Sequence, residues 1–130
     1  MSLNDPLANV LSHILNCERK NIKETTIKPV SKIIVKILEI LQKNYFIGSF
    51  ETVKNMKGGY IQLNLIGNIN KCGVIKPRFP VAIEEFEKFE KRYLPAKNIG
   101  LLIVSTSKGV MTHKEALKNN IGGKLIAYCY

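Results

Sequence analysis

Two stretches of the chain repeat apolar residues at the spacing of an amphipathic helix. The first covers about residues 6–18. Asp5 precedes it, and Pro6 occupies the first helical position, which is a common start signal of a helix. The second begins after Ser31, whose hydroxyl suits a helix N-cap, and its polar side carries lysines. The apolar positions are Leu7, Val10, Leu11 and Ile14 in the first stretch and Ile34, Ile37, Leu38 and Leu41 in the second. Both patterns predict helices that bury one face.

Strand-forming residues follow in shorter runs, and turn-forming residues separate them. Residues 21–28 alternate weakly up to a proline, which indicates a short strand. Residues 46–53 and 60–66 are rich in β-branched and aromatic side chains and enclose a polar loop with two glycines, which is typical of a hairpin. The predicted order of elements is therefore α-β-α-β-β, and Gly67 with Asn68 ends it.

The composition changes after Gly67 and Asn68, where the chain becomes richer in proline and positive charge. We place a domain boundary here, which gives an N-terminal domain of residues 1–67 and a C-terminal domain of residues 68–130. In the second domain, residues 84–92 are densely charged and predict a solvated helical turn. Residues 101–104 are all apolar and predict a buried strand.

The last part of the chain predicts one short helix and a closing strand. Thr112 and Glu115 have the spacing of a capping box, and the helix that they begin ends near Asn119, before a glycine pair. Residues 125–130 predict a strand. The expected fold is therefore α/β, of the α+β kind, with two small domains: an α-β-α-β-β unit, and a mostly-β unit with one short helix.

The charge of the chain indicates an anionic partner. Twenty Lys and Arg against ten Asp and Glu give a net charge of +10 over 130 residues, and the excess is present in both domains. A chain of this length holds one ordinary domain or two very small ones, which excludes a large multidomain enzyme. No apolar run is long enough to cross a bilayer and the N-terminus resembles no signal peptide, so we expect a cytoplasmic protein with no membrane partner.

The three cysteines, Cys17, Cys72 and Cys129, stand far apart and form no C-x-x-C pair. Isolated thiols in odd number are typical of reduced core residues. His13 and Cys17 are four residues apart and would share one face of the first helix, but two ligands do not make a zinc site. We therefore predict no metal and no cofactor, and the sequence also lacks the phosphate-binding loops of nucleotide hydrolases.

A Ser/His hydrolase is the one enzyme that the sequence leaves open. Ser105 and His113 are eight residues apart, across a predicted strand, turn and helix. No nucleophile-elbow motif surrounds the serine and no acid is placed to orient the imidazole, so the alternative is a solvated histidine at the start of a helix. Our prediction is that the protein is not an enzyme.

One short stretch has the side chains of a nucleic-acid contact. Residues 105–109, Ser-Thr-Ser-Lys-Gly, place three hydroxyls, one ammonium and a glycine directly after the buried strand. Such groups can donate to phosphate, to the 2′-hydroxyl or to base edges, and the lysine adds positive charge. The structural alternative is an ordinary polar loop. Phe79 and Tyr93 stand beside basic residues, as stacking platforms for bases do, although core packing is the more common role of such residues.

Residues 100–117, which contain this stretch, resemble the signature of the small-subunit ribosomal protein S8 family at every position. Further segments similar to the same family are residues 5–8, Ser31 with Lys32, and Gly122 with Gly123. Residues 71–81 and 88–95 resemble the archaeal and eukaryotic branch, and the Lys and Ile usage favours an archaeal source. Bacterial members commonly carry an acid directly after the paired glycines, where this chain has Lys124.

The resemblance implies a structural protein of the small ribosomal subunit that binds a helix in the central domain of the subunit's RNA and promotes early assembly. It implies neighbouring small-subunit proteins as partners, and it leaves open whether the chain also binds its own messenger RNA, as bacterial members do. We expect a monomer outside the ribosome. The expected RNA-binding residues are Ser105, Thr106, Ser107, Lys108, Gly109, Asp5, Ser31, Lys32, Lys76, Arg78, Gly122, Gly123 and Lys124. A basic domain that coats any nucleic acid is the alternative.

Overall fold

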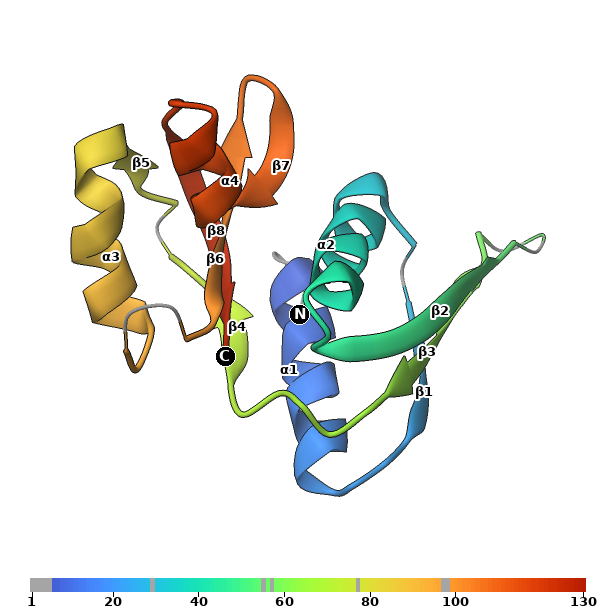
Figure 1. Ribbon diagram of the computed structural model, residues 1–130. Helices are drawn as coiled ribbons and strands as arrows, with labels where there is room; N and C mark the ends of the chain where they lie inside the picture. The colour runs from blue at the N-terminus through green and yellow to red at the C-terminus, as the bar shows by residue number, and fades with distance from the viewer. Residues whose placement is uncertain (1–5, 29, 55, 57, 77, 97–98) are drawn as a thin grey trace. The chain divides into compact units, whose positions relative to one another are not determined.

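The computed structural model describes residues 6–28, 30–54, 56, 58–76, 78–96 and 99–130. The chain forms two compact units, Met1–Asn70 and Lys71–Tyr130, each with its own sheet and helices (Figure 1). The combination of helices with antiparallel sheets confirms the predicted α+β fold. No helix in the described part of the chain is both long and apolar enough to span a membrane.

The first unit has the predicted order of elements. It consists of α1 (Pro6–Arg19), β1 (Glu24–Ile27), α2 (Lys32–Lys43), β2 (Ile47–Val53) and β3 (Tyr60–Leu65). The three strands are antiparallel in the order β1-β3-β2. Every second residue of β3 is buried, so only one face of this sheet is covered, and α1 and α2 pack on that face with their apolar stripes (Figure 1).

Both helices of the first unit end with a residue in the left-handed backbone conformation. These residues are Asn21 (φ 58°) after α1 and Tyr45 (φ 64°) after α2. Beyond Tyr45, the amide of Phe46 donates to the carbonyl of Leu41 at 2.9 Å, the bond of a Schellman motif. Glycine is the usual residue at this position and asparagine the next best, so Tyr45 is held there against its intrinsic preference.

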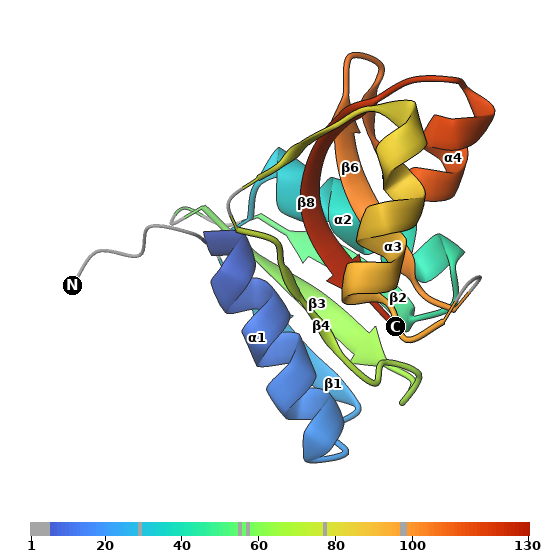
Figure 2. The same cartoon turned by 90° about the vertical axis from the view of Figure 1, so that its left-hand side faces the viewer.

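The second unit is built around its last strand. Its elements are β4 (Cys72–Val74), β5 (Pro80–Val81), the 3₁₀ turn η1 (Ile83–Glu85), α3 (Phe86–Tyr93), β6 (Leu101–Thr106), β7 (Gly109–Thr112), α4 (His113–Lys118) and β8 (Gly123–Cys129). The sheet order is β4-β8-β6-β7, and β5 also pairs with β8. Figure 2 shows β8 beside β6. A core of side chains from α3, α4 and one face of this sheet holds the unit together.

The prediction of only one short helix in this unit is wrong. Residues 84–92, expected to form a solvated helical turn, belong to η1 and α3, and this helix is not solvated on all sides, since Phe86 and Phe89 are 0% and 5% exposed. The charged side chains of this segment lie on the outer face of α3. Because they outnumber the two buried phenylalanines at positions i and i+3, the apolar face is hard to recognise in the sequence. Ser31 and Thr112 are confirmed as helix N-caps. The Ser31 hydroxyl accepts from Ile34 N, and the Thr112 hydroxyl accepts from Glu115 N.

Candidate nucleic-acid interface

The Ser-Thr-Ser-Lys-Gly stretch forms the end of β6, a tight turn and the start of β7. Thr106 pairs with Gly109 across the turn. The Thr106 hydroxyl donates to Gly109 O at 2.7 Å and accepts from Lys108 N at 3.2 Å. Gly109 has a φ of 117°, which only glycine adopts without strain. Thr106 and Gly109 therefore fix the shape of the turn.

The other side chains of the turn are directed at solvent. Ser105, Ser107 and Lys108 are exposed. Neither serine hydroxyl has a hydrogen-bond partner within the part of the chain that the structure describes. The Thr106 hydroxyl fixes the backbone positions that carry these side chains, and their hydroxyls and ammonium group can donate to a ligand.

A lysine lies directly beside Ser105 on the neighbouring strand. Ser105 of β6 pairs with Lys124 of β8, and Lys124 pairs on its other side with Pro80 of β5. Side chains opposite one another in antiparallel strands share a face, with Cβ atoms about 5 Å apart. The adjoining residues Val104 and Leu125 point into the core with α3 and α4. Ser105 and Lys124 therefore lie together on the opposite face of the sheet.

The paired glycines let the backbones of three strands approach closely. A Cβ atom at Gly123 would lie 2.3 Å from the carbonyl oxygen of Ser105, and one at Gly122 would lie 2.6 Å from the carbonyl oxygen of Val81. No side chain fits at these distances. Gly122 and Gly123 thus hold β8 against β5 and β6, and their role is to position Lys124 and Ser105.

Lys76 and Arg78 lie in the segment that joins β4 to β5 along the same end of β8. Ile75 N donates to Ile126 O at 2.9 Å, and Leu125 N donates to Phe79 O at 3.0 Å, which fixes this segment next to β8. Both cations are exposed. We define the polar edge as the expected residues that the second unit brings together: Ser105–Gly109, Gly122–Lys124, Lys76 and Arg78. Sequence spacing does not show this convergence, because the segments are joined only through β8.

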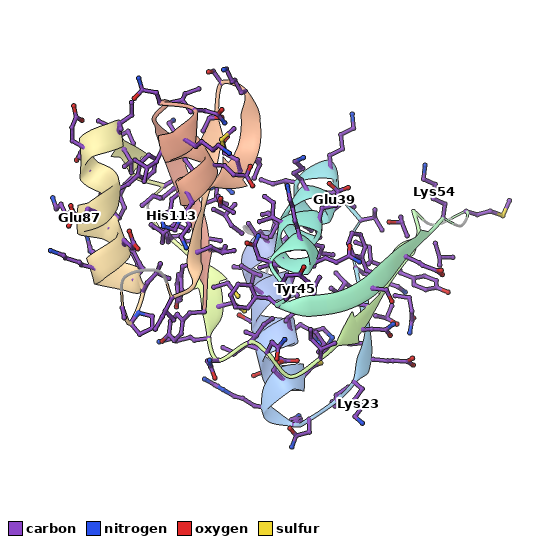
Figure 3. The ribbon with its side chains drawn as sticks, in the orientation of Figure 1. Lys23, Glu39, Tyr45, Lys54, Glu87 and His113 are labelled. Carbon is purple, nitrogen blue, oxygen red and sulfur yellow. The ribbon has the colours of Figure 1, made fainter. Side chains whose placement is uncertain are left out.

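The expected contacts in the first unit are separate features. Ser31 caps α2, since its hydroxyl accepts from Ile34 N at 3.3 Å, and Lys32 is the first residue of that helix. An open groove between α2 and β2 is lined by Ser31 and Lys32 and also by Lys36 and Lys54, the last of which is labelled in Figure 3. The sequence prediction did not include Lys36 or Lys54. Asp5 lies outside the described residues.

His113 does not form a catalytic pair with Ser105. The imidazole is 1% exposed, and its Nδ1 accepts from Leu102 N at 3.1 Å. Leu102 is three residues from Ser105, or about 10 Å along β6. The expectation of a solvated histidine at the start of α4 is therefore also wrong, since His113 is a core residue whose Nε2 faces Oε2 of Glu90 at 3.7 Å.

The buried position of His113 predicts a loss of stability at acidic pH. Burial lowers the pKa of His113 below its ordinary value of 6.5, against the opposing effect of Glu90. As the pH falls below 6.5, the unfolded chain gains a proton at this residue that the folded chain resists, so the free energy of unfolding decreases. Urea unfolding at pH 7.5, 6.5 and 5.5 checks this. His113→Asn, whose amide oxygen can still accept from Leu102 N, is expected to be less stable but to show a flatter pH dependence, and an unchanged slope would contradict the assignment.

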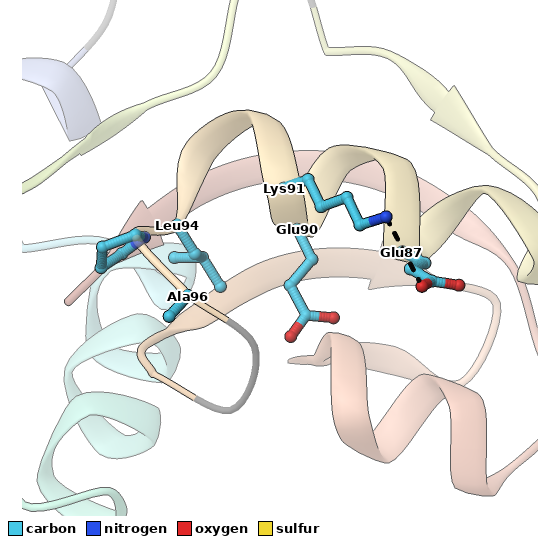
Figure 4. Close-up of a pocket in the computed structure, with 6 residues that line it drawn as sticks. Glu87, Glu90, Lys91, Leu94 and Ala96 are labelled. Carbon is cyan, nitrogen blue, oxygen red and sulfur yellow. Dashed lines mark ion pairs between the residues drawn. The ribbon is translucent and has the colours of Figure 1, made fainter.

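A small pocket lies beside Glu90 and does not belong to the polar edge. It has a volume of about 160 Å³ and is formed by the C-terminal half of α3 and the residues that follow it (Figure 4). Its lining residues are Glu87, Glu90, Lys91, Leu94, Pro95 and Ala96. Lys91 and Glu87 pair across its outer rim at 3.9 Å, and both are well exposed. None of the expected RNA-binding residues lines it.

The cysteines are confirmed as core residues, because Cys17, Cys72 and Cys129 are at most 5% exposed. Cys17 Sγ lies 3.7 Å from Nε2 of His13, which also bonds the Thr25 hydroxyl at 2.6 Å. Among the described residues, no three His, Cys, Asp or Glu side chains gather as metal ligands. His13 is exposed, and its imidazole hydrogen-bonds the buried Cys17 thiol and the Thr25 hydroxyl.

The polar edge has the groups of a nucleic-acid-binding protein: exposed hydroxyls and cations on a rigid sheet. Comparison with known families supplies the identification, since the sequence model of the family described as Ribosomal protein S8 matches residues 5–130. The chain belongs to the ribosomal protein S8 family. It is therefore a protein of the small ribosomal subunit, in a family that is structural and not enzymatic and that binds small-subunit RNA and ribosomal proteins.

Proposed function

We propose that the chain binds a helix in the central domain of small-subunit ribosomal RNA through the polar edge of its C-terminal unit, and thereby promotes folding of that RNA and assembly of the subunit. The observation that supports this most is the pairing of Ser105 with Lys124 across β6 and β8. It puts a hydroxyl donor and a cation on one face, at a position defined by the sheet. RNA helices with irregular or unpaired bases offer acceptors to such groups on the 2′-hydroxyl, the phosphate and the base edges.

The two kinds of side chain have different tasks in this proposal. Ser105 and Ser107 read the shape of the distorted helix, because a neutral hydroxyl needs an acceptor at a fixed place. Lys108, Lys124 and Arg78 contribute a salt-dependent, sequence-independent share of the affinity. A domain that coats any nucleic acid would have only the second kind of contact.

The N-terminal unit makes a secondary contact in this proposal. Ser31, Lys32 and the lysines of the groove beside them would meet a neighbouring RNA backbone, and Asp5 precedes the helix expected to approach it. The free protein is a monomer, acts on cytoplasmic ribosomes and neighbours other small-subunit proteins. Binding to its own messenger RNA would use the same polar edge, so that the messenger and the ribosomal RNA compete.

The test is filter binding of the purified protein to a transcribed central-domain fragment, with excess transfer RNA as competitor. Binding of the fragment that persists in the presence of the competitor supports the proposal. If transfer RNA displaces the fragment completely, the chain binds RNA non-specifically through its positive charge. Adding an unlabelled transcript of the leader of its own messenger tests the feedback proposal. That proposal fails if this transcript displaces the fragment no better than transfer RNA does.

Ser107→Ala is expected to weaken binding to the fragment by about threefold to tenfold, the effect of one lost hydrogen bond of about 0.5–1.5 kcal/mol. The fold is expected to be unchanged, because the Ser107 hydroxyl has no partner within the described residues. Ser49→Ala is the control, since Ser49 is an exposed serine of the first unit; its hydroxyl accepts from the Asn64 side chain at 2.8 Å, so a small loss of stability is expected without a loss of RNA affinity. If the wild type and Ser107→Ala bind the RNA fragment with equal affinity, the RNA-binding site does not include the Ser107 hydroxyl.

Lys124→Gln is expected to weaken binding to every RNA alike and to reduce the salt dependence. If the ammonium meets one phosphate, the slope of log affinity against log salt decreases in magnitude by about 1. The measurement is filter binding at several salt concentrations. Lys118→Gln, at an exposed position near the end of α4, has the same charge change and should leave the slope unaltered. If both variants reduce the slope equally, Lys124 has no special place in the interface.

A further inference from the structure

Tyr45 is an exposed aromatic residue in a backbone conformation that disfavours it. Its side chain is 78% exposed, and its φ of 64° lies in the left-handed region. Asn21 and Asn120 occupy the equivalent positions after α1 and α4, with φ of 58° in both cases. Packing within the unit does not require a ring at Tyr45, and the backbone would favour glycine or asparagine. Figure 3 shows Tyr45 where α2 leads into β2.

Other apolar side chains are exposed at the same end of the first unit. Ile66 follows β3 and is 49% exposed, and Ile22 follows α1 and is 41% exposed. Both line one surface groove. Tyr45 is tied to the segment after Ile66, because the Asn68 side chain donates to Tyr45 O at 2.8 Å. We call Ile22, Tyr45 and Ile66 the apolar end of the unit.

Three exposed lysines lie close to the apolar end. Lys23 lines the groove with Ile22 and Ile66, and Lys20 and Lys43 each stand two residues before an apolar residue of this end. The nearby Glu18 carboxylate is engaged, since its Oε2 accepts from Ile69 N at 3.1 Å. Grouped exposed apolar residues with a charged rim are typical of a protein interaction site.

Two features favour a protein over RNA as the occupant. Aliphatic side chains such as Ile22 and Ile66 give no stacking surface or hydrogen bond to a nucleotide, but they bury well against another apolar surface. The apolar end also lies at the C-termini of α1 and α2, where the helix dipoles repel phosphate. The lysines then complement carboxylates on a protein.

We propose that the apolar end docks a neighbouring protein of the small subunit, whose contact surface is apolar at its centre and acidic at its rim, with Tyr45 as the anchor. This inference rests on the proposed function, which brings the chain into the subunit. Such a contact explains an exposed aromatic ring at a position where the backbone favours glycine or asparagine, because tyrosines buried in protein interfaces contribute strongly to binding.

The first test is photocrosslinking inside the assembled particle. Tyr45 is replaced by p-benzoylphenylalanine in the full chain, which is reconstituted with small-subunit RNA and the total small-subunit proteins depleted of this chain. The expected result is a crosslink to one ribosomal protein, within a peptide that contains Asp or Glu. A crosslink to RNA, to a second copy of the chain or to nothing would overturn the inference. A chain that fails to enter the particle would instead count against the proposed function.

The second test separates the ring from the backbone. Tyr45→Gly and Asn120→Gly both place glycine at a left-handed position, so both are expected to raise the Tm of the free protein. Only Tyr45→Gly should weaken binding to the protein identified by crosslinking, by about tenfold. Tyr45→Phe should retain the affinity within about twofold. Equal affinity of Tyr45→Gly and the wild type would overturn the inference, whereas loss of RNA-fragment binding by the wild type would overturn the proposed function.

Discussion

Gly123→Ala is expected to detach β8 from β6, to destabilise the second unit by about 3 kcal/mol and to remove specific RNA binding. The added Cβ would lie 2.3 Å from Ser105 O and 2.9 Å from the Val104 side chain, so strand separation is the only relief. Val104 is fully buried, which leaves it no room to move. The measurements are urea unfolding and filter binding to the central-domain fragment.

Gly122→Ala is the matched control for this prediction. Its Cβ would meet Val81 O at 2.6 Å, but Val81 belongs to β5, a two-residue strand that can shift more easily than β6. We expect a smaller loss of stability and partial RNA binding. If Gly123→Ala unfolds at the same urea concentration as the wild type, the close approach of β6 and β8 is not a constraint on the polar edge.

Phe86→Ala is expected to destabilise the second unit by about 3–5 kcal/mol, because it empties the space of a fully buried ring. Phe86 is 0% exposed and belongs to the core cluster with Phe89, Leu102 and Leu125. For a unit of this size, the loss lowers the Tm by roughly 10 °C or more. Thermal unfolding followed by circular dichroism measures it.

Lys88→Ala, on the exposed side of the same helix, serves as the control for Phe86→Ala. Its ammonium lies 5.6 Å from the Phe89 ring centroid at the surface, so we expect a change within about 0.5 kcal/mol. A stability loss for Phe86→Ala no larger than that of Lys88→Ala would mean that residues 84–92 form a solvated turn after all.

The elements that the sequence predicts correctly are those with a local signal. The stripes that end in Ile14 and Leu41 and the cap residues Ser31 and Thr112 depend on residues within two turns of one another. These helices therefore form where their local sequence favours them, and packing in the folded protein does not oppose that preference. The same holds for Leu101–Thr106, whose run of apolar residues indicates a strand buried on both faces.

The short strands that the sequence misses depend on distant partners. β4 and β5 are three and two residues long and exist because β8 pairs with both of them. β7 begins inside the Ser-Thr-Ser-Lys-Gly stretch and is defined by its pairing with β6. No periodicity develops over so few residues, so neither propensity nor pattern can indicate these strands.

The candidate site divides in the same way. The Ser105–Gly109 turn has a local composition that marks it as a polar contact, and the resemblance to the family selects the same residues. The burial of His113 and the pairing of Lys124 with Pro80 and Ser105 arise from core packing and strand pairing, which the local sequence does not indicate. The sequence indicates only that His113 stands at the start of a helix, and histidines at such positions are usually solvated.

The central position of β8 has a consequence for the order of events during synthesis. β4, β5 and β6 all pair with β8, and residues 123–129 are the last strand of the unit to leave the translating ribosome. Until then the sheet lacks its middle strand, and Ser105 has no Lys124 opposite it. On the proposed function, a chain that ends before β8 lacks the polar edge and is expected not to bind the ribosomal RNA.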